Sequence, residues 1–253
     1  MSDIKKLSGI LSVVQMPYEA SGAPDWSILQ EEVNWVFENG GDGVVAAMVT
    51  EILRLTEGER DQLAQKLVAF AFGRGPVVMS VGGESTAQAV RNAQAAESAG
   101  VQALIAIPPL SIGALAAEII TYYESILDAT TVPLVVQDAS GYVGIPLPIP
   151  LMADLYERFP NRVAFKPEAL PLGPTLSALR SAVGPEAAIF EGSGGIGLID
   201  SHRRGVTGTM PGAEVIWAIR ALWDALEAGE EDRALEIHGF LFPLVALQQG
   251  LDV

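Results

Sequence analysis

The chain has 253 residues and a formal net charge of −16, and 49% of its side chains are hydrophobic. This length and composition allow a large buried core, while the acidic charge repels a polyanion, so we exclude nucleic acid as a partner. The sequence has no cysteine, no signal segment and no apolar run near the roughly 20 residues that span a bilayer, which excludes thiol chemistry and a membrane partner and predicts a cytoplasmic protein.

Eight short runs rich in β-forming residues follow one another along the chain. They span 9–14, 43–49, 76–81, 102–107, 132–137, 162–166, 187–191 and 205–210. Most of them are continuously apolar instead of alternating between apolar and polar residues. This pattern is typical of parallel strands that are covered on both faces.

Helical patterns fill the segments between these runs. Apolar residues from Leu29 to Phe37 recur at helical spacing, and capping boxes at Thr56–Glu59 and Ser85–Gln88 each predict the start of a helix. Gly100 is a suitable C-terminal cap for the second of these helices. Further helical patterns span 114–128, 148–159, 172–183 and 213–228.

The alternation of strands and helices predicts a (β/α)8 TIM barrel in a single domain over residues 1–253, because the length is close to the ~250 residues typical of that fold. An extra helical segment is expected at 231–249. The helices after about residue 211 are expected to cover the barrel and to offer an apolar interface to another copy of the chain. A doubly wound open sheet is the alternative fold.

Lys166 is the leading candidate for chemistry, because it ends the sixth predicted strand and reactive groups of a TIM barrel lie at the carboxyl ends of the strands. An amine in that position loses solvation, which disfavours its charged form and leaves more of the neutral nucleophile. Such a lysine condenses with a ketone, and the protonated imine withdraws electrons from the adjacent carbon. Alternatively, Lys166 extends to solvent or pairs with Glu168.

Four stretches carry a resemblance to a known family. They are DGVVAAMVTEILRLTEGER, SVGGESTAQAVRNAQAAESAGVQALIAIPP, VPLVVQDASGYVGIPL and RVAFKPEA, in that order along the chain. The chain resembles, from about residue 9 to about 250, the dihydrodipicolinate synthase and N-acetylneuraminate lyase superfamily of class I Schiff-base (β/α)8 enzymes. The resemblance implies that Lys166 forms the imine, that Thr50 binds the carboxylate of a 2-keto acid, and that the protein is a homo-oligomer, a dimer or tetramer.

The departures from this family narrow the expected reaction. Gln137 stands where members that make dihydrodipicolinate or cleave sialic acid carry a tyrosine, and Leu110 replaces the aromatic residue that usually follows Pro-Pro. Their proton-relaying phenols are therefore missing. The combination of QDA, FK-x-E and Thr-Gly-Thr-Met is similar instead to the 2-keto-3-deoxy sugar acid branch, in particular the L-2-keto-3-deoxyarabonate dehydratases.

We therefore expect a lyase in which Lys166 attacks C2 of a 2-keto acid and a base removes a proton from C3. The candidate bases are Asp138, Glu168 and Tyr142. Alternatively, Asp138 caps the loop after the fifth strand, and Glu168 is a structural partner of the lysine or a charge at a helix N-terminus. The expected substrate contacts are made by Thr50, Glu51, Gln137, Tyr142, Gly192 and Thr207.

Two other functions remain open from the sequence. Glu51, Asp138, Glu168 and Glu191 all follow predicted strands, and such oxygen ligands suit the magnesium or manganese ion of a metal-dependent keto-acid aldolase. A catalytically weak keto-acid binding protein is the other alternative. For the leading interpretation we expect no cofactor and no metal, and we interpret GSGGIG at 192–197 as a turn instead of a dinucleotide site.

Overall fold

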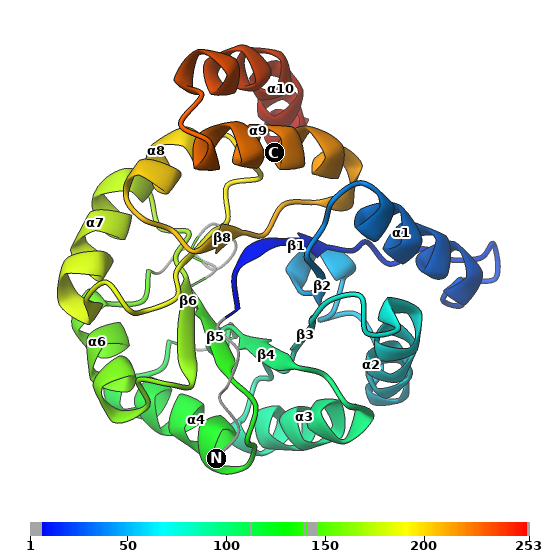
Figure 1. Cartoon of the computed structure of the whole chain (residues 1–253). Helices are drawn as coiled ribbons and strands as arrows, with labels where there is room; N and C mark the ends of the chain where they lie inside the picture. Colours follow the sequence, from blue (N-terminus) through cyan, green and yellow to red (C-terminus); the bar gives the residue numbers. More distant parts are fainter. Residues whose placement is uncertain (1–6, 112, 139, 141–145, 252–253) are drawn as a thin grey trace.

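The computed structural model describes residues 7–111, 113–138, 140 and 146–251. Its eight parallel strands are hydrogen-bonded in the order β6-β5-β4-β3-β2-β1-β8-β7, and a bridge between Phe165 and Ile189 closes β6 onto β7. The sheet is thus a closed (β/α)8 barrel surrounded by helices, as Figure 1 shows, and the open-sheet alternative is wrong. The strands are β1 (Gly9–Val13), β2 (Gly43–Ala46), β3 (Val77–Ser80), β4 (Ala103–Ala106), β5 (Leu134–Gln137), β6 (Val163–Lys166), β7 (Phe190–Glu191) and β8 (Gly208–Thr209).

The helices confirm most of the predicted helical segments. Thr56 accepts a hydrogen bond from the Glu59 amide at 3.3 Å and Glu59 accepts from the Thr56 amide at 2.8 Å, so the first capping box is formed. The second box forms at Ser85, and Gly100, with φ of 92°, ends that helix. The helices are α1 (Trp26–Glu38), α2 (Glu57–Ala71), α3 (Thr86–Ala99), α4 (Ala116–Asp128), α6 (Ile149–Arg158), α7 (Leu172–Val183), α8 (Leu198–Arg203), α9 (Ile216–Glu227) and α10 (Glu231–Leu251), with 3₁₀ turns η1 (Met48–Thr50) and η2 (Ala213–Val215).

Two buried layers form the core, because successive side chains of a strand point to opposite faces. At β2, Val45 and Ala47 belong to the cluster that fills the barrel, whereas Val44 and Ala46 belong to the cluster between the sheet and the helices. The same alternation at β6 places Ala164 inside the barrel and Phe165 outside. Both faces of the strands are therefore apolar, as their continuous hydrophobic runs predict.

Two of the local differences between prediction and structure lie at the end of β2 and at α8. The strand predicted to reach Val49 ends at Ala46, because the Thr50 hydroxyl accepts the Ala47 amide at 3.0 Å and holds the chain in η1. The helix α8 between β7 and β8 is not among the predicted helices. It has 6 residues, too few for an apolar repeat to be recognised.

The last two helices differ in what they cover. Helix α9 packs against β1, whereas α10 lies outside the helical ring and packs against α9, as Figure 1 shows. Of the two, α9 is thus the helix in contact with the barrel strands. The outer side of α10 exposes large apolar side chains, among them Phe240 at 81% and Leu247 at 60%. Within the described ranges, no helix is long and apolar enough to cross a membrane.

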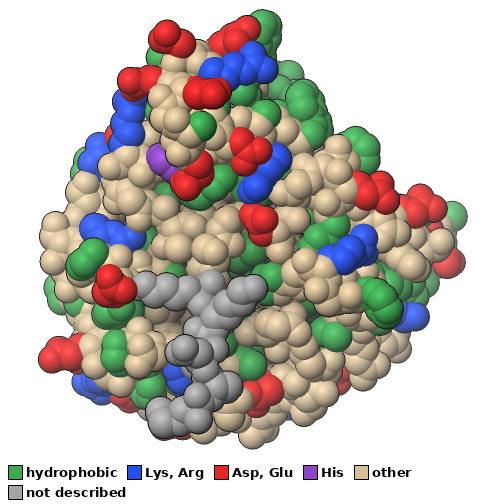
Figure 2. Space-filling view, in the orientation of Figure 1, with side chains coloured by type: hydrophobic (Ala, Val, Ile, Leu, Met, Phe, Trp, Pro, Cys, Tyr) green, Lys and Arg blue, Asp and Glu red, His purple; other side chains and the backbone are tan. Residues whose placement is uncertain are grey.

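Helix α10 also contacts the loop between β7 and α8. The His238 Nε2 atom lies 2.9 Å from the Ile196 carbonyl oxygen, and a Cβ atom added to Gly194 would lie 3.4 Å from Val245. On the visible face of the molecule, acidic and basic side chains lie beside one another around α9 and α10, as Figure 2 shows.

Candidate active site

Lys166 is the last residue of β6 and lies at the carboxyl end of the barrel. It is paired in register with Gln137, the last residue of β5. Because Ala164 points into the barrel, the alternation of the strand turns Lys166 inward as well. Its side chain is 7% exposed, so the amine does not extend to bulk solvent.

Glu168 is the direct partner of the Lys166 amine. Its Oε1 atom accepts a short hydrogen bond from Lys166 Nζ, and its side chain is 12% exposed. The Gln137 amide donates to the same carboxylate, with Nε2 at 3.1 Å from Oε1 and 3.2 Å from Oε2. An amine, a carboxylate and an amide are thus held together in a site largely shielded from water, where electrostatic interactions are strengthened.

Gly192 lies beside this group. A Cβ atom added at residue 192 would lie 2.9 Å from Lys166 Cε, and 3.1 Å from both Lys166 Nζ and Glu168 Oε1. The close approach of the β7 backbone to the amine therefore needs a residue without a side chain. The structure brings four of the predicted site residues together: Gln137, Lys166, Glu168 and Gly192.

Asp138 is buried, at 1% exposure, but it faces backbone amides. Its Oδ1 atom accepts from the Ser140 amide at 2.7 Å, and its Oδ2 atom accepts from the Ala169 amide at 3.1 Å. Both oxygens thus connect the loops that follow β5 and β6. This geometry favours the interpretation of Asp138 as a loop cap over that of a base. Tyr142, the third candidate base, lies outside the described residues.

Thr50 and Glu51 lie at the end of η1, and neither contacts the Lys166 group. The Thr50 hydroxyl donates to the Val14 carbonyl at 2.5 Å while accepting from Ala47, so it fastens the loops after β1 and β2. Glu51 has φ of 56°, is 40% exposed in its side chain, and pairs with Arg54 at 3.2 Å. The single donor of the Thr50 hydroxyl, which a substrate carboxylate would need, is thus already used within the protein.

Thr207 lies at the wrong end of the barrel for the predicted substrate contact. It precedes the first residue of β8, and its hydroxyl accepts the Ile189 amide at 3.2 Å. The strand predicted over 205–210 is shorter in the structure, where β8 begins at Gly208 and runs toward the carboxyl face. Thr207 is therefore at the amino end of its strand, away from Lys166.

Glu191 forms a second buried carboxylate site, whose partner Thr209 the sequence did not identify. The two side chains are fully buried, and Glu191 accepts from the Thr209 hydroxyl and from the Ser193 amide, both at 2.6 Å. Across the described part of the chain, no three His, Cys, Asp or Glu side chains are grouped so that they could hold a metal ion. The four carboxylates of the metal-dependent alternative do not converge, since Glu51 pairs with Arg54 and Asp138 faces backbone.

Buried tyrosines do not replace the missing phenols. Tyr122 and Tyr123 lie on α4 behind β4, and their hydroxyls donate to the carbonyls of Ile107 and Ala106 at 3.2 and 3.3 Å. Burial raises the pKa of Tyr122 to about 12 and that of Tyr123 well above its ordinary value. Both phenols therefore stay protonated near neutral pH and brace the end of β4.

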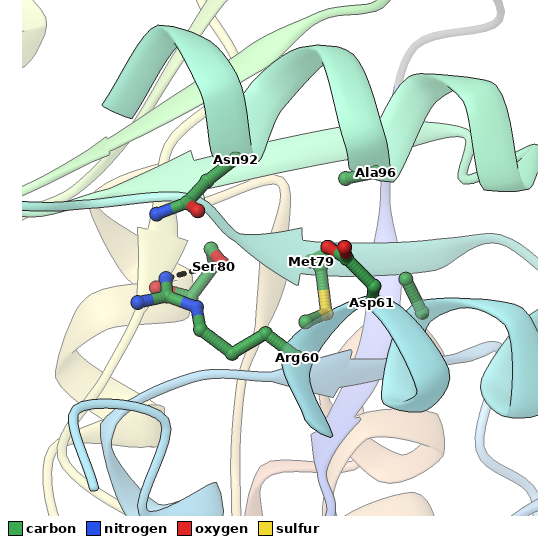
Figure 3. A pocket seen from close by; sticks show the side chains of 7 residues that line it. Arg60, Asp61, Met79, Ser80, Asn92 and Ala96 are labelled. Carbon is green, nitrogen blue, oxygen red and sulfur yellow. Dashed lines mark hydrogen bonds between the residues drawn. The ribbon is translucent and has the colours of Figure 1, made fainter. Parts of the chain in front are cut away.

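A small cavity lies outside the barrel wall, between α2, α3 and β3. In Figure 3 the Arg60 guanidinium extends along it, and its Nη2 atom donates to the carbonyls of Ser80 and Gly82 at 3.2 and 3.1 Å. None of the predicted site residues lines this cavity. Arg60 therefore holds the carboxyl end of β3 in place from behind.

Known proteins similar to this chain agree with the fold and with the family that the sequence resembles. The model of the dihydrodipicolinate synthetase family matches residues 6–249. A 4-hydroxy-tetrahydrodipicolinate synthase of Methylobacterium radiotolerans is 29% identical over 97% of this chain and 81% of its own length. An L-2-keto-3-deoxyarabonate dehydratase of Azospirillum brasilense is 26% identical over 94% of this chain and 78% of its own. The structure of YagE, a prophage protein of E. coli K12 in complex with pyruvate, matches with a TM-score of 0.89 at 21% identity over 96% of this chain and 83% of that one.

Proposed function

The chain belongs to the dihydrodipicolinate synthetase family, and we propose that this class I Schiff-base lyase dehydrates a 2-keto-3-deoxy sugar acid. The observation that carries the proposal is the buried contact of the Lys166 amine with Glu168, next to Gln137 in place of a phenol. A carboxylate beside the amine supplies the acid–base group that this chain otherwise lacks at that position.

The names of the relatives support two different reactions. The relative from Methylobacterium radiotolerans is a synthase, and the one from Azospirillum brasilense is a dehydratase of a 2-keto-3-deoxy sugar acid. Their identities to this chain are close, 29% and 26%, so similarity alone does not choose between them. The choice rests on Gln137 and Glu168, because an amide cannot relay a proton as a phenol does. YagE, whose structure holds pyruvate, supports a keto acid as the ligand.

The proposed reaction begins at the amine. Glu168 accepts a proton from Lys166, and the neutral amine attacks C2 of the keto acid. Glu168 then returns this proton to the C2 oxygen, which leaves as water, so that a protonated imine forms on Lys166 and Glu168 is a carboxylate again. This imine draws electrons from C3, so that a C3–H bond can be broken by a carboxylate.

The same carboxylate, that of Glu168, then assists elimination of the C4 hydroxyl group. Glu168 takes the C3 proton, and the electron pair forms an enamine with C3 and C2. The enamine expels the hydroxyl group from C4, and the proton held by Glu168 leaves with it as water. Hydrolysis of the imine releases the product and restores the Lys166 amine.

Trapping with borohydride tests the imine. The protein is incubated with pyruvate or a 2-keto-3-deoxy acid and borohydride, and the adduct mass is sought on the peptide that contains Lys166. We expect an adduct with the natural chain and with Lys66→Met, a matched change at an exposed lysine on α2, but none with Lys166→Met. Absence of an adduct with several keto acids contradicts the proposal.

Turnover separates the lyase from a keto-acid binding protein. A binding protein of this fold gives an adduct but leaves the C4 hydroxyl in place. A dehydratase converts the 2-keto-3-deoxy acid into a product lighter by one water, which mass spectrometry of the reaction mixture detects. An aldolase instead releases pyruvate and an aldehyde from the same substrate.

We also propose that the outer side of α10 supports self-association. Phe240, Leu244 and Leu247 are spaced at i, i+4 and i+7, and each is at least 48% exposed. We expect the mass measured by light scattering to exceed that of one chain and to fall in the variant Phe240→Asp. A monomeric mass of the unchanged protein contradicts the proposal.

A further inference from the structure

The side-chain amide of Gln137 donates to both carboxylate oxygens of Glu168. Its side chain is 2% exposed, and its Nε2 atom lies within 3.2 Å of both carboxylate oxygens. Because Gln137 and Lys166 are register partners at the ends of neighbouring strands, the amide and the amine approach Glu168 from two adjacent strands. The sequence predicted a substrate contact for Gln137, whereas its amide donor is directed at another protein side chain.

The two donors to Glu168 do not persist equally through the reaction. Among the described residues, the side-chain donors to this carboxylate are the Lys166 amine and the Gln137 amide. The Lys166 ammonium has three N–H donors. When its nitrogen is bonded to C2 of a keto acid as a protonated imine, a single N–H remains to donate to Glu168. The amide of Gln137 is unchanged by that step, so it continues to hold the carboxylate.

Gly192 also lies next to the Glu168 carboxylate. The position of a Cβ atom on Gly192 is 3.1 Å from Glu168 Oε1, which is tight contact. Glu168 is thus bounded by the amide, the amine and the backbone at the end of β7. Of these neighbours, the amide keeps its full donor capacity once the imine has formed, whereas the imine nitrogen keeps a single N–H.

We infer that Gln137 is a positioning residue that acts through Glu168, holding its carboxylate beside the imine for removal of the C3 proton. The inference rests on the proposed function, because it needs the imine on Lys166. It differs from the prediction of a substrate contact in a measurable way. A positioning residue matters only while Glu168 is a carboxylate, whereas a substrate contact matters whatever stands at residue 168.

Two measurements separate imine formation from proton removal. Borohydride trapping of pyruvate reports the imine, and exchange of the pyruvate C3 protons with deuterium, followed by proton NMR in heavy water, reports removal of the C3 proton. We expect Gln137→Met to give the same final yield of adduct and to slow the exchange about 10- to 100-fold, the factor associated with a hydrogen bond to an ionised group. An equal adduct yield also shows that the variant is folded.

A double-mutant cycle gives the decisive comparison. We expect Gln137→Met to change the exchange rate by less than about twofold when introduced into Glu168→Gln, because the carboxylate it positions is then gone. Gln137→Asn, whose amide is shorter by one methylene, is expected to behave as Gln137→Met in both backgrounds. Gln65→Met, at an exposed site on α2, is the matched control and leaves the exchange rate unchanged.

The outcomes that overturn the inference are distinct from those that overturn the proposed function. If Gln137→Met slows exchange equally with and without Glu168, Gln137 contacts the substrate and the inference is wrong. The inference is also wrong if Gln137→Met exchanges as fast as the unchanged protein. If the unchanged protein forms no adduct, the Schiff-base proposal fails, and the positioning role fails with it.

Discussion

Two carboxylates near the ends of neighbouring strands, the half-buried Glu168 after β6 and the fully buried Glu191 at the end of β7, have different partners. Glu168 accepts from the Lys166 amine and the Gln137 amide, whereas Glu191 accepts from a backbone amide and a threonine hydroxyl. Phe190 belongs to the barrel interior, so the alternation of β7 turns Glu191 toward the outer layer. Burial alone therefore does not single out the acid proposed to react, and what distinguishes Glu168 from Glu191 is its ionisable partner on the inner face of the barrel.

Replacement of Glu168 should change the activity more than any other substitution considered. Glu168→Gln removes the group that is proposed to take the C3 proton, so we expect exchange of the pyruvate C3 protons to slow by about 10²- to 10⁴-fold. The thermal midpoint should change little, because the amide oxygen of the introduced glutamine can still accept from neighbouring donors. Exchange within a factor of two of the unchanged protein would show that another residue is the base.

Gly192→Ala tests the room around the amine. The added methyl group would lie 2.9 Å from Lys166 Cε, so the lysine and Glu168 must move apart or tilt. We expect the rate of pyruvate trapping to fall about tenfold, with a loss of about 1–3 kcal/mol in the free energy of unfolding. If the trapping rate is unchanged, the backbone at residue 192 moves to accommodate the methyl group, and the side chains of Lys166 and Glu168 keep their positions.

Glu191→Ala addresses the outer carboxylate. It leaves the Thr209 hydroxyl and the Ser193 amide without this acceptor, which costs about 1–3 kcal/mol in the free energy of unfolding measured in urea. Pyruvate trapping by the folded protein should be retained. Loss of trapping without loss of stability would place Glu191 in the chemistry and undo the comparison.

Glu32 is a partly buried acid that lies away from Lys166 and Glu168. Its replacement should have the smallest effect, a change in the free energy of unfolding that depends on pH. Burial raises its pKa to about 7, opposed by the hydrogen bond from the Gln15 amide and assisted by Glu214. The raised pKa means that the folded chain binds this proton more tightly than the unfolded chain. Its stabilising contribution is therefore complete below the unfolded pKa and is lost as the pH rises through about 7.

Glu32→Gln makes that dependence measurable, since glutamine stays neutral. We expect the variant to match the unchanged protein at about pH 5 and to exceed it by about 1–2 kcal/mol at about pH 8, allowing for partial exposure of Glu32 to solvent. Urea unfolding at the two pH values checks this. A constant difference between the proteins across this range would show that Glu32 does not titrate there.

The fold could be predicted from the sequence wherever local patterns determine it. The capping boxes at Thr56 and Ser85, the cap at Gly100 and the eight apolar runs each depend on residues a few positions apart. The short helix α8 was missed because it has too few residues to show a repeat, and the end of β2 depends on a side chain from the turn that follows it.

The site was harder to predict, because partners lie far apart in the sequence. The position of Lys166 at a strand end could be predicted, since strand ends meet at one face of a barrel. That Gln137 faces Glu168, and that Asp138 faces the Ala169 amide, follow from tertiary contacts between different loops. Thr207 was misplaced because a shift of a few residues along a strand moves a side chain from one end of the barrel to the other.

The packing of α10 on the loop after β7 brings a late part of the chain close to the Lys166–Glu168 pair. Val245 of this helix lies against Gly194, only two positions beyond the glycine that borders the amine. The loop that continues from the glycine beside the amine is thus held in place by contacts from α10, at Gly194 and at the Ile196 carbonyl.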